Sequence, residues 1–172
     1  MDLLKKTLLA GFLATLVMGT LFHFVYGWTG NWVVAGFFVP VNESTWEHMK
    51  LLFFPMLLCS FPIKRILSAR YPCVSSALSL GNLAGTFLIP VLFYTYTGVL
   101  GTNIMVLDLL TFFLSVLAAF YLVLHFTRSC RVQRWEAVLN SLMVILFFCF
   151  LLFTYMPPEI GLFQPPVPLC FS

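Results

Sequence analysis

One run of the sequence, Pro40 to Lys50, holds the densest set of side chains that could do chemistry. If a helix begins near residue 42, residues spaced by four share a face, so Glu43 lies over Glu47 and His48 falls on the next stripe. A carboxylate beside an imidazole can bind a metal ion or act in acid/base catalysis, because histidine titrates near neutral pH. We therefore expect Glu43, Glu47 and His48 to be the catalytic residues.

Two residues that are distant in the sequence could join this run. His23 is expected in the last turn of one apolar segment and Asp108 in the first turn of another, at the same end of the protein as His48. Ionisable groups next to apolar segments are candidates for functional sites. Imidazoles and carboxylates together suit zinc or another divalent ion. The predicted metal ligands are His23, Glu47, His48 and Asp108.

The same run also has a purely structural interpretation. Ser44 and Glu47 have the spacing of a capping box, in which each side chain accepts from a free N–H at the start of a helix. Acidic residues favour a helix N-terminus through the macrodipole, and Trp46 is typical of an aromatic belt at a membrane surface. Capping alone leaves His48 and Lys50 unexplained, because both follow the first turn.

The composition indicates which solvent surrounds these residues. The chain has 172 residues, of which 61% are hydrophobic and 9% charged, with a mean hydropathy of +1.00. A soluble domain carries about 25% charged residues, so this chain has too little polar surface for water. We expect an all-α integral membrane protein that contacts membrane lipid. Nothing in the composition or the charge pattern indicates nucleic-acid binding.

Apolar runs bounded by charges or turn residues predict five transmembrane helices in a single membrane domain, because about 20 residues cross the hydrocarbon. Their expected ranges are 8–26, 46–63, 74–97, 104–127 and 137–156. Residues 157–172 form a predicted extracytoplasmic tail. The stretch from Trp32 to Val39 is too short to span, and we expect an interfacial or re-entrant segment there.

Basic residues predict the orientation. Eight of the nine Lys and Arg lie before the first span or in the connections between spans two and three and between spans four and five. The positive-inside rule places these segments in the cytoplasm. The amino terminus is then cytoplasmic, the carboxyl terminus is outside, and the acidic and histidine residues of the candidate site face outward from the plasma membrane.

Smaller features predict packing rather than chemistry. The five cysteines form no C-x-x-C pair, so we expect no disulfide framework. Ala77, Gly81 and Gly85 recur every fourth residue and predict a face of close helix approach. Asn82 lies beside this face and is expected to hydrogen-bond to a neighbouring helix.

The motif Pro40-Val41-Asn42-Glu43-Ser44-x-Trp46-Glu47-His48-x-Lys50-Leu51 resembles a P-V-N-E-S-x-W-E-H-x-K-L signature. It is found in an uncharacterised family of small bacterial multi-pass membrane proteins. Similarity to the family pattern continues at His23, at the Tyr94-x-Tyr96 turn, at Asp108 and at Pro157-Pro158. The resemblance implies a multi-pass membrane protein and implies no activity.

Three functions are compatible with these patterns. The first is metal-assisted hydrolysis of a lipid or envelope substrate at the outer site. The second is a solute-binding or transport subunit that works with a protein partner or as a homo-oligomer. The third is a non-catalytic structural or assembly protein, in which the motif only caps and anchors its helix.

Overall fold

The computed structural model describes residues 2–166 and is all-helical. Helices account for 79% of the protein, and residues 2–166 contain no strand. The α-helices are α1 (Leu3–Trp28), α2 (Val33–Gly36), α3 (Thr45–Leu67), α4 (Val74–Leu100), α5 (Met105–Ser129) and α6 (Glu136–Tyr155). Two short 3-10 helices, η1 (Gln133–Trp135) and η2 (Gly161–Phe163), flank α6.

The five long helices lie where the apolar runs predicted them. The structure extends most of them by a few residues, and the short α2 occupies the segment between Trp32 and Val39. Helix α6 ends at Tyr155, before Pro157 and Pro158, because proline cannot donate a backbone N–H or continue a helix. Of the predicted tail, residues 157–166 carry η2, and residues 167–172 lie outside the described residues.

Four helices of the described chain are long and apolar enough to cross a membrane: α1, α4, α5 and the segment Gln133–Tyr155 that contains α6. Helix α3 has 23 residues and carries Glu47, Lys50, Lys64 and Arg65. It is nevertheless the helix with the most buried side chains, including Lys50 and Glu47. These two charged residues are therefore enclosed by the other helices, whereas Lys64 and Arg65 near its end are exposed.

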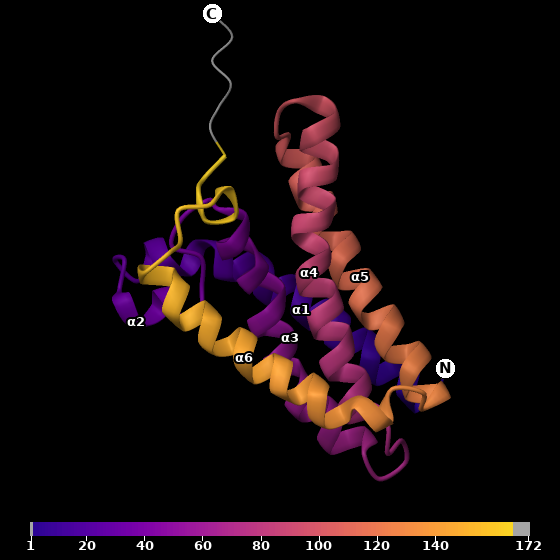
Figure 1. Ribbon diagram of the computed structural model, residues 1–172. Coiled ribbons are helices and arrows are strands. Elements are labelled where there is room, and N and C mark those ends of the chain that lie inside the picture. The colour runs from indigo at the N-terminus through magenta and orange to yellow at the C-terminus, as the bar shows by residue number, and fades with distance from the viewer. Residues whose placement is uncertain (1, 167–172) are drawn as a thin grey trace, which may run out of the picture.

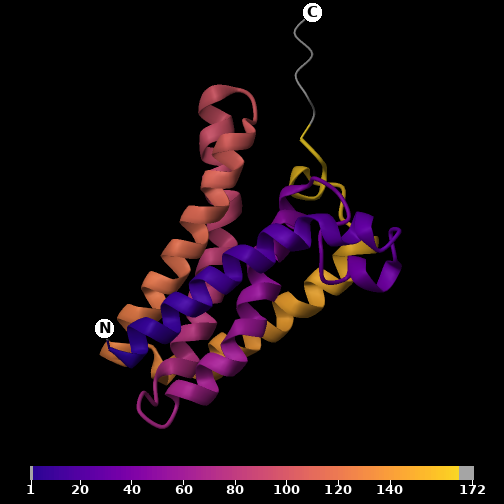
Figure 2. The ribbon, with the colours of Figure 1, turned by 180° about the vertical axis from the view of Figure 1, so that it is seen from behind.

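Helix α3 occupies the centre of the bundle. It packs against α1 and α4, and its aromatic side chains contact α6, where the Phe150 ring lies 4.7 Å from Trp46 and 5.1 Å from Phe53 between centroids. Figure 1 shows α6 in front and Figure 2 shows α1 in front, with α3 between them. In both views α4 and α5 run side by side, and their connecting turn extends beyond the other helices.

Small residues bring α4 and α5 together, as the spacing of Gly81 and Gly85 predicted. A Cβ atom on Gly81 would lie 2.7 Å from the backbone oxygen of Ala119, and one on Gly85 would lie 2.7 Å from the Ala119 Cβ. Only glycine allows this approach without displacing backbone. The Asn82 side chain donates to the Phe53 carbonyl of α3 at 3.1 Å, which confirms the predicted contact with a neighbouring helix.

The two ends of the bundle differ in charge. At one end the Asp2 carboxylate accepts from the Tyr71 hydroxyl at 3.3 Å and lies 3.7 Å from Arg128 Nη2, so the start of α1, the α3–α4 connection and the end of α5 meet. Eight of the nine Lys and Arg lie in or next to these segments. The opposite end gathers the end of α1, the start of α3 and the α4–α5 turn, and there the charged groups are acidic or histidine except for the buried Lys50.

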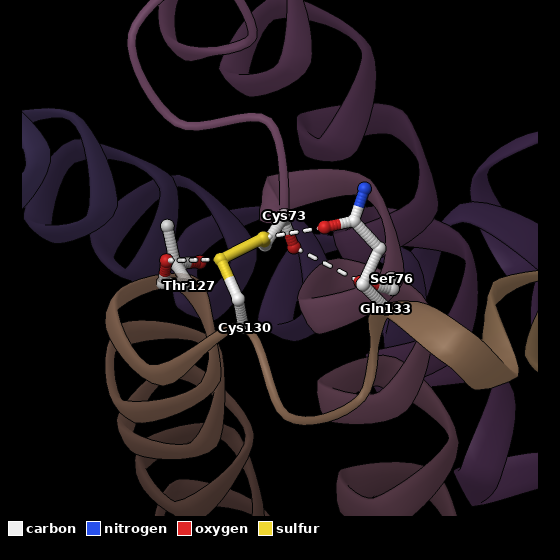
Figure 3. Close-up of a disulfide and its surroundings, with 5 residues drawn as sticks. All are labelled: Cys73, Ser76, Thr127, Cys130 and Gln133. Atoms are coloured by element: carbon white, nitrogen blue, oxygen red, sulfur yellow. Dashed lines mark hydrogen bonds between the residues drawn. A yellow bond between two sulfur atoms is a disulfide. The ribbon is translucent and has the colours of Figure 1, made fainter.

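The prediction that no cysteines are paired is wrong for two of them. Cys73, just before α4, forms a disulfide with Cys130, just after α5, across a sequence separation of 57 residues (Figure 3). The antiparallel packing of α4 and α5 brings these ends together, which no local spacing signals. Cys59 and Cys149 are free, and Cys170 lies outside the described residues.

The α4–α5 contact generates a first test. Gly81→Ala should lower the free energy of unfolding by about 1 to 3 kcal/mol, because the new methyl group meets backbone. The effect opposes helix propensity, which favours alanine over glycine by about 1 kcal/mol. Gly98→Ala, in the same helix with open space around it, is the control and should be neutral or stabilising. Thermal unfolding of the two purified variants in the same detergent measures both changes in stability. Equal changes for the two variants would contradict the close packing of α4 against α5.

The disulfide generates a second test. Cys73→Ser should destabilise the oxidised protein by about 2 to 4 kcal/mol, because the crosslink restricts the unfolded chain. Reductant should reproduce this loss in the wild type and have no further effect on the variant. Cys149→Ser is the control and should keep the response to reductant. Maleimide labelling of both Cys73 and Cys130 in air-oxidised, denatured protein would show that the pair does not form.

Candidate functional site

The start of α3 is fixed by the residues just before it. Ser44 is the N-cap and its hydroxyl accepts from the Glu47 N–H at 3.4 Å, while the Asn42 side chain accepts from the Ser44 N–H at 2.8 Å. One half of the predicted capping box is therefore present. The other half differs, because Asn42 rather than Glu47 serves the N–H of Ser44.

Glu47 instead belongs to a buried ion pair. Its Oε2 atom accepts from Lys50 Nζ at 2.7 Å and from the Val41 N–H at 3.0 Å, and the Glu47 and Lys50 side chains are 2% and 0% exposed. Lys50 Nζ also donates to the Gly36 carbonyl at 3.0 Å and to the Thr154 hydroxyl of α6. All three protons of the ammonium group are thus satisfied.

This network positions the loop before α3. Through Val41 and Gly36 it connects the loop and α2 to the helix, and through Thr154 it connects them to α6. Sequence reasoning did not identify Gly36 or Thr154 as partners. The sequence feature that could have indicated such partners was Lys50 itself, because a lysine in an apolar bundle requires hydrogen-bond acceptors.

His48 is oriented by the backbone of the same turn. Its Nδ1 atom lies 2.9 Å from the Ser44 carbonyl oxygen, and because a carbonyl can only accept, Nδ1 carries a proton. The other ring nitrogen, Nε2, lies 3.4 Å from Glu43 Oε2. This is the arrangement common in metal-binding histidines, in which one nitrogen donates to a carbonyl and the other is directed at the metal.

His23 of α1 reaches the same carboxylate. Its Nε2 atom lies 3.9 Å from Glu43 Oε1, and the rings of His23 and His48 are 5.5 Å apart between centroids. Glu43 precedes the N-cap, so its side chain does not follow the helical face on which Glu47 lies. The structure therefore brings together His23, Glu43 and His48, which we call the outer cluster.

The outer cluster affects the Glu43 carboxyl directly. The hydrogen bond with His48 lowers the pKa of Glu43 below its ordinary value, and the positive potential of His48 and His23 adds to this, against a smaller opposing effect of burial. A carboxylate with a lowered pKa stabilises the fold above its ordinary pKa, and this contribution is lost as the pH falls through the folded-state pKa. The contribution of Glu43 is therefore lost on acidification, and it is small because Glu43 is 67% exposed.

The geometry suits a metal ion. One candidate ligand atom from each of His23, Glu43 and His48 lies within 4.8 Å of the others. Zinc ligands at about 2.0 to 2.1 Å in a tetrahedron are about 3.3 Å apart, so all three side chains would have to approach one another by up to about 1.5 Å, and the exposed Glu43 side chain is the freest to move. Three protein ligands with an open fourth position are typical of catalytic zinc sites.

Asp108 lines the same pocket, of about 270 Å³, as Glu43 and His48 of the outer cluster. The pocket lies between α3, α4 and α5, and its lining includes Glu43, His48 and Asp108. The Tyr96 hydroxyl of α4 donates to Asp108 Oδ1 and so holds the carboxylate in place. Tyr96 is a further site residue that sequence reasoning did not single out by role.

The predicted site residues thus divide into two groups. His23, His48 and Asp108 lie at the same end of the bundle, and Glu43 joins the two histidines, so it replaces Glu47 in the candidate ligand set. The structure places Glu47 in the pair with Lys50, where its Oε2 atom accepts two hydrogen bonds and its side chain is only 2% exposed. A ligand or catalytic role of Glu47 is therefore not carried forward.

Fold and site together define an all-helical protein with apolar helices of membrane-spanning length and a histidine–glutamate cluster at one end. The chain belongs to a family of unknown function (DUF6512), whose model matches residues 1–168. Neither the curated proteins nor the solved structures include a match to this chain.

The buried ion pair can be tested by removing one partner. Lys50→Met should lower the free energy of unfolding by about 3 to 5 kcal/mol, because Glu47 is left buried without its counter-charge. The double variant with Glu47→Gln should recover much of this loss. Lys64→Met, at an exposed position of the same helix, is the control and should change stability by less than about 0.5 kcal/mol. Chemical unfolding in detergent measures all three, and equal losses for Lys50→Met and Lys64→Met would contradict the network.

Proposed function

We propose that this chain is a five-span protein of the plasma membrane whose outer face carries a divalent metal site, and that the site hydrolyses a lipid or envelope substrate. The observation that carries the proposal is the outer cluster. Three ligand atoms from two helices and the loop before α3 converge at the edge of a pocket. The family assignment is compatible with any activity and favours none.

The fifth span in this proposal is α3. Its 23 residues would extend about 34 Å at 1.5 Å per residue, which exceeds the hydrocarbon thickness of about 30 Å. Its two interior charges neutralise each other in the Glu47–Lys50 pair, and α1, α4 and α6 shield it from lipid. Five spans place the two ends of the chain on opposite sides, and the basic end is assigned to the cytoplasm.

This orientation places Cys73 and Cys130 at the cytoplasmic end. Disulfides rarely persist in the cytosol, so the pair is expected to be reduced in growing cells and to oxidise when the protein is purified in air. The outer cluster then lies on the side where envelope and lipid substrates are accessible.

The proposed chemistry is that of a metal-bound water. His23, Glu43 and His48 would hold a divalent ion, which would supply Lewis acidity and a bound water of lowered pKa for attack on an ester or amide carbonyl. Hydrolysis would break the bond from the carbonyl carbon to the leaving oxygen or nitrogen. The leaving group would take the proton that the attacking water gives up.

The metal content of the purified protein tests the proposal. Wild-type protein equilibrated with zinc and desalted should retain about one ion per chain, and zinc at 100 times its Kd should stabilise the fold by about 2.7 kcal/mol. His23→Ala and His48→Ala should each lose the ion and this stabilisation. His125→Ala, the remaining histidine, lies at the basic end and should retain both.

Acidification should release the ion, because the imidazoles must be deprotonated to bind it. A wild-type protein that binds no stoichiometric metal, and whose thermal midpoint is unaffected by zinc and by chelator, would refute the metal site. Metal binding without hydrolysis of any lipid or envelope ester would support the metal site and refute the proposed hydrolysis.

A further inference from the structure

The pocket beside the outer cluster is lined by both polar and apolar side chains. The ionisable ones are Glu43, His48 and Asp108. The large apolar ones are Leu51 of α3, Ile89 and Phe93 of α4, and Phe112 of α5. A fully polar solute would bury polar groups against these apolar side chains without hydrogen bonds, at a cost of about 1 to 3 kcal/mol for each group.

The charge of the pocket selects the polar end of its occupant. Glu43 and Asp108 are both acidic, His48 is the one basic side chain among the described residues that line the pocket, and its ring is directed at Glu43 rather than at Asp108. Lys50 lies in the same helix but is fully buried in the network with Glu47, so it offers no positive charge here. A half-buried carboxylate such as Asp108, beside apolar side chains, favours a cation and disfavours an anionic group.

The volume limits the apolar end. The pocket of about 270 Å³ lies at the small end of ligand-binding pockets. Its size and its apolar side chains match one alkyl chain segment better than two chains side by side.

We propose that this pocket binds a single-chain amphiphile with an ammonium group. The ammonium lies against Asp108, the chain lies among Leu51, Ile89, Phe93 and Phe112, and the ester or amide bond between them is presented to the outer cluster. This assignment rests on the proposed function, since it names the substrate class of the same site. Binding of the amphiphile itself requires no metal.

Photoaffinity labelling of the chelated, metal-free protein tests the assignment. The probe is decyltrimethylammonium with a diazirine at the end of its chain, added to full-length protein in phosphatidylcholine nanodiscs. Adducts are expected in the peptides that contain Ile89, Phe93 and Leu51. Unlabelled decyltrimethylammonium should compete at a concentration at least 10-fold lower than decyl sulfate, which has the same chain and the opposite charge.

Two matched variants separate the pocket from the acidic surface around it. Asp108→Asn should reduce the 10-fold preference for the cation to less than about 3-fold while chain-end adducts persist, and its thermal midpoint establishes that it is folded. Glu159→Gln removes an exposed acid of the described chain that does not line the pocket and should retain the full preference.

Equal competition by the cation and the sulfate would overturn the assignment. Adducts confined to lipid-facing residues such as Leu109 would overturn it as well. Either result, in a protein that still binds zinc, would refute only the proposed substrate class and would not affect the proposed metal site. Normal labelling of a protein that binds no zinc would refute the proposed hydrolysis and support the amphiphile site.

Discussion

The buried pair of Glu47 and Lys50 is the interaction on which the rest of the structure depends. Charges that are removed from water are stable only when they are paired and their remaining hydrogen-bonding positions are filled. Here Oε2 of the carboxylate accepts from Val41 and the ammonium donates to Gly36 and Thr154, so each charge has hydrogen bonds beyond the pair itself. One pair of charges thereby joins α2, the loop before α3, α3 itself and α6.

The geometry of the outer cluster follows from this pair. The Val41 contact fixes the loop two residues before Glu43, and the Ser44 cap fixes the first turn of α3. The His48 ring is then held by the Ser44 carbonyl and directed at Glu43. Glu47 thus supports the site through the backbone, while the ligand atoms come from the residues on either side of it. A motif with two carboxylates therefore uses one for structure and exposes the other.

Much of the fold could be predicted from the sequence, because the dominant signals are local. Uncharged runs gave the helices, Pro157 gave the end of α6, and the four-residue spacing of Gly81 and Gly85 gave the α4–α5 contact. The convergence of His23 and His48 was also predictable. Both lie near helix ends on the same side of the bundle, and the basic residues identify that side.

The parts that were not predictable depend on contacts between distant segments. Glu43 and Glu47 would share a face only if both were helical, but the helix begins after Glu43, and Lys50 then attracts Glu47 inward. The partners Gly36 and Thr154 come from α2 and α6, and Cys73 and Cys130 are 57 residues apart. None of these pairings has a periodic signature, because each depends on how the helices pack.

The central position of α3 has a consequence for how the protein is made. Helix α3 is the least apolar of the five long helices, and its lysine shares no hydrogen bond with α6 until Thr154 has been synthesised, 104 residues later. During translation Lys50 therefore has its counter-charge, Glu47, long before it has its hydroxyl acceptor. The hydrogen bonds of this buried ammonium group are completed only when the last long helix packs against α3.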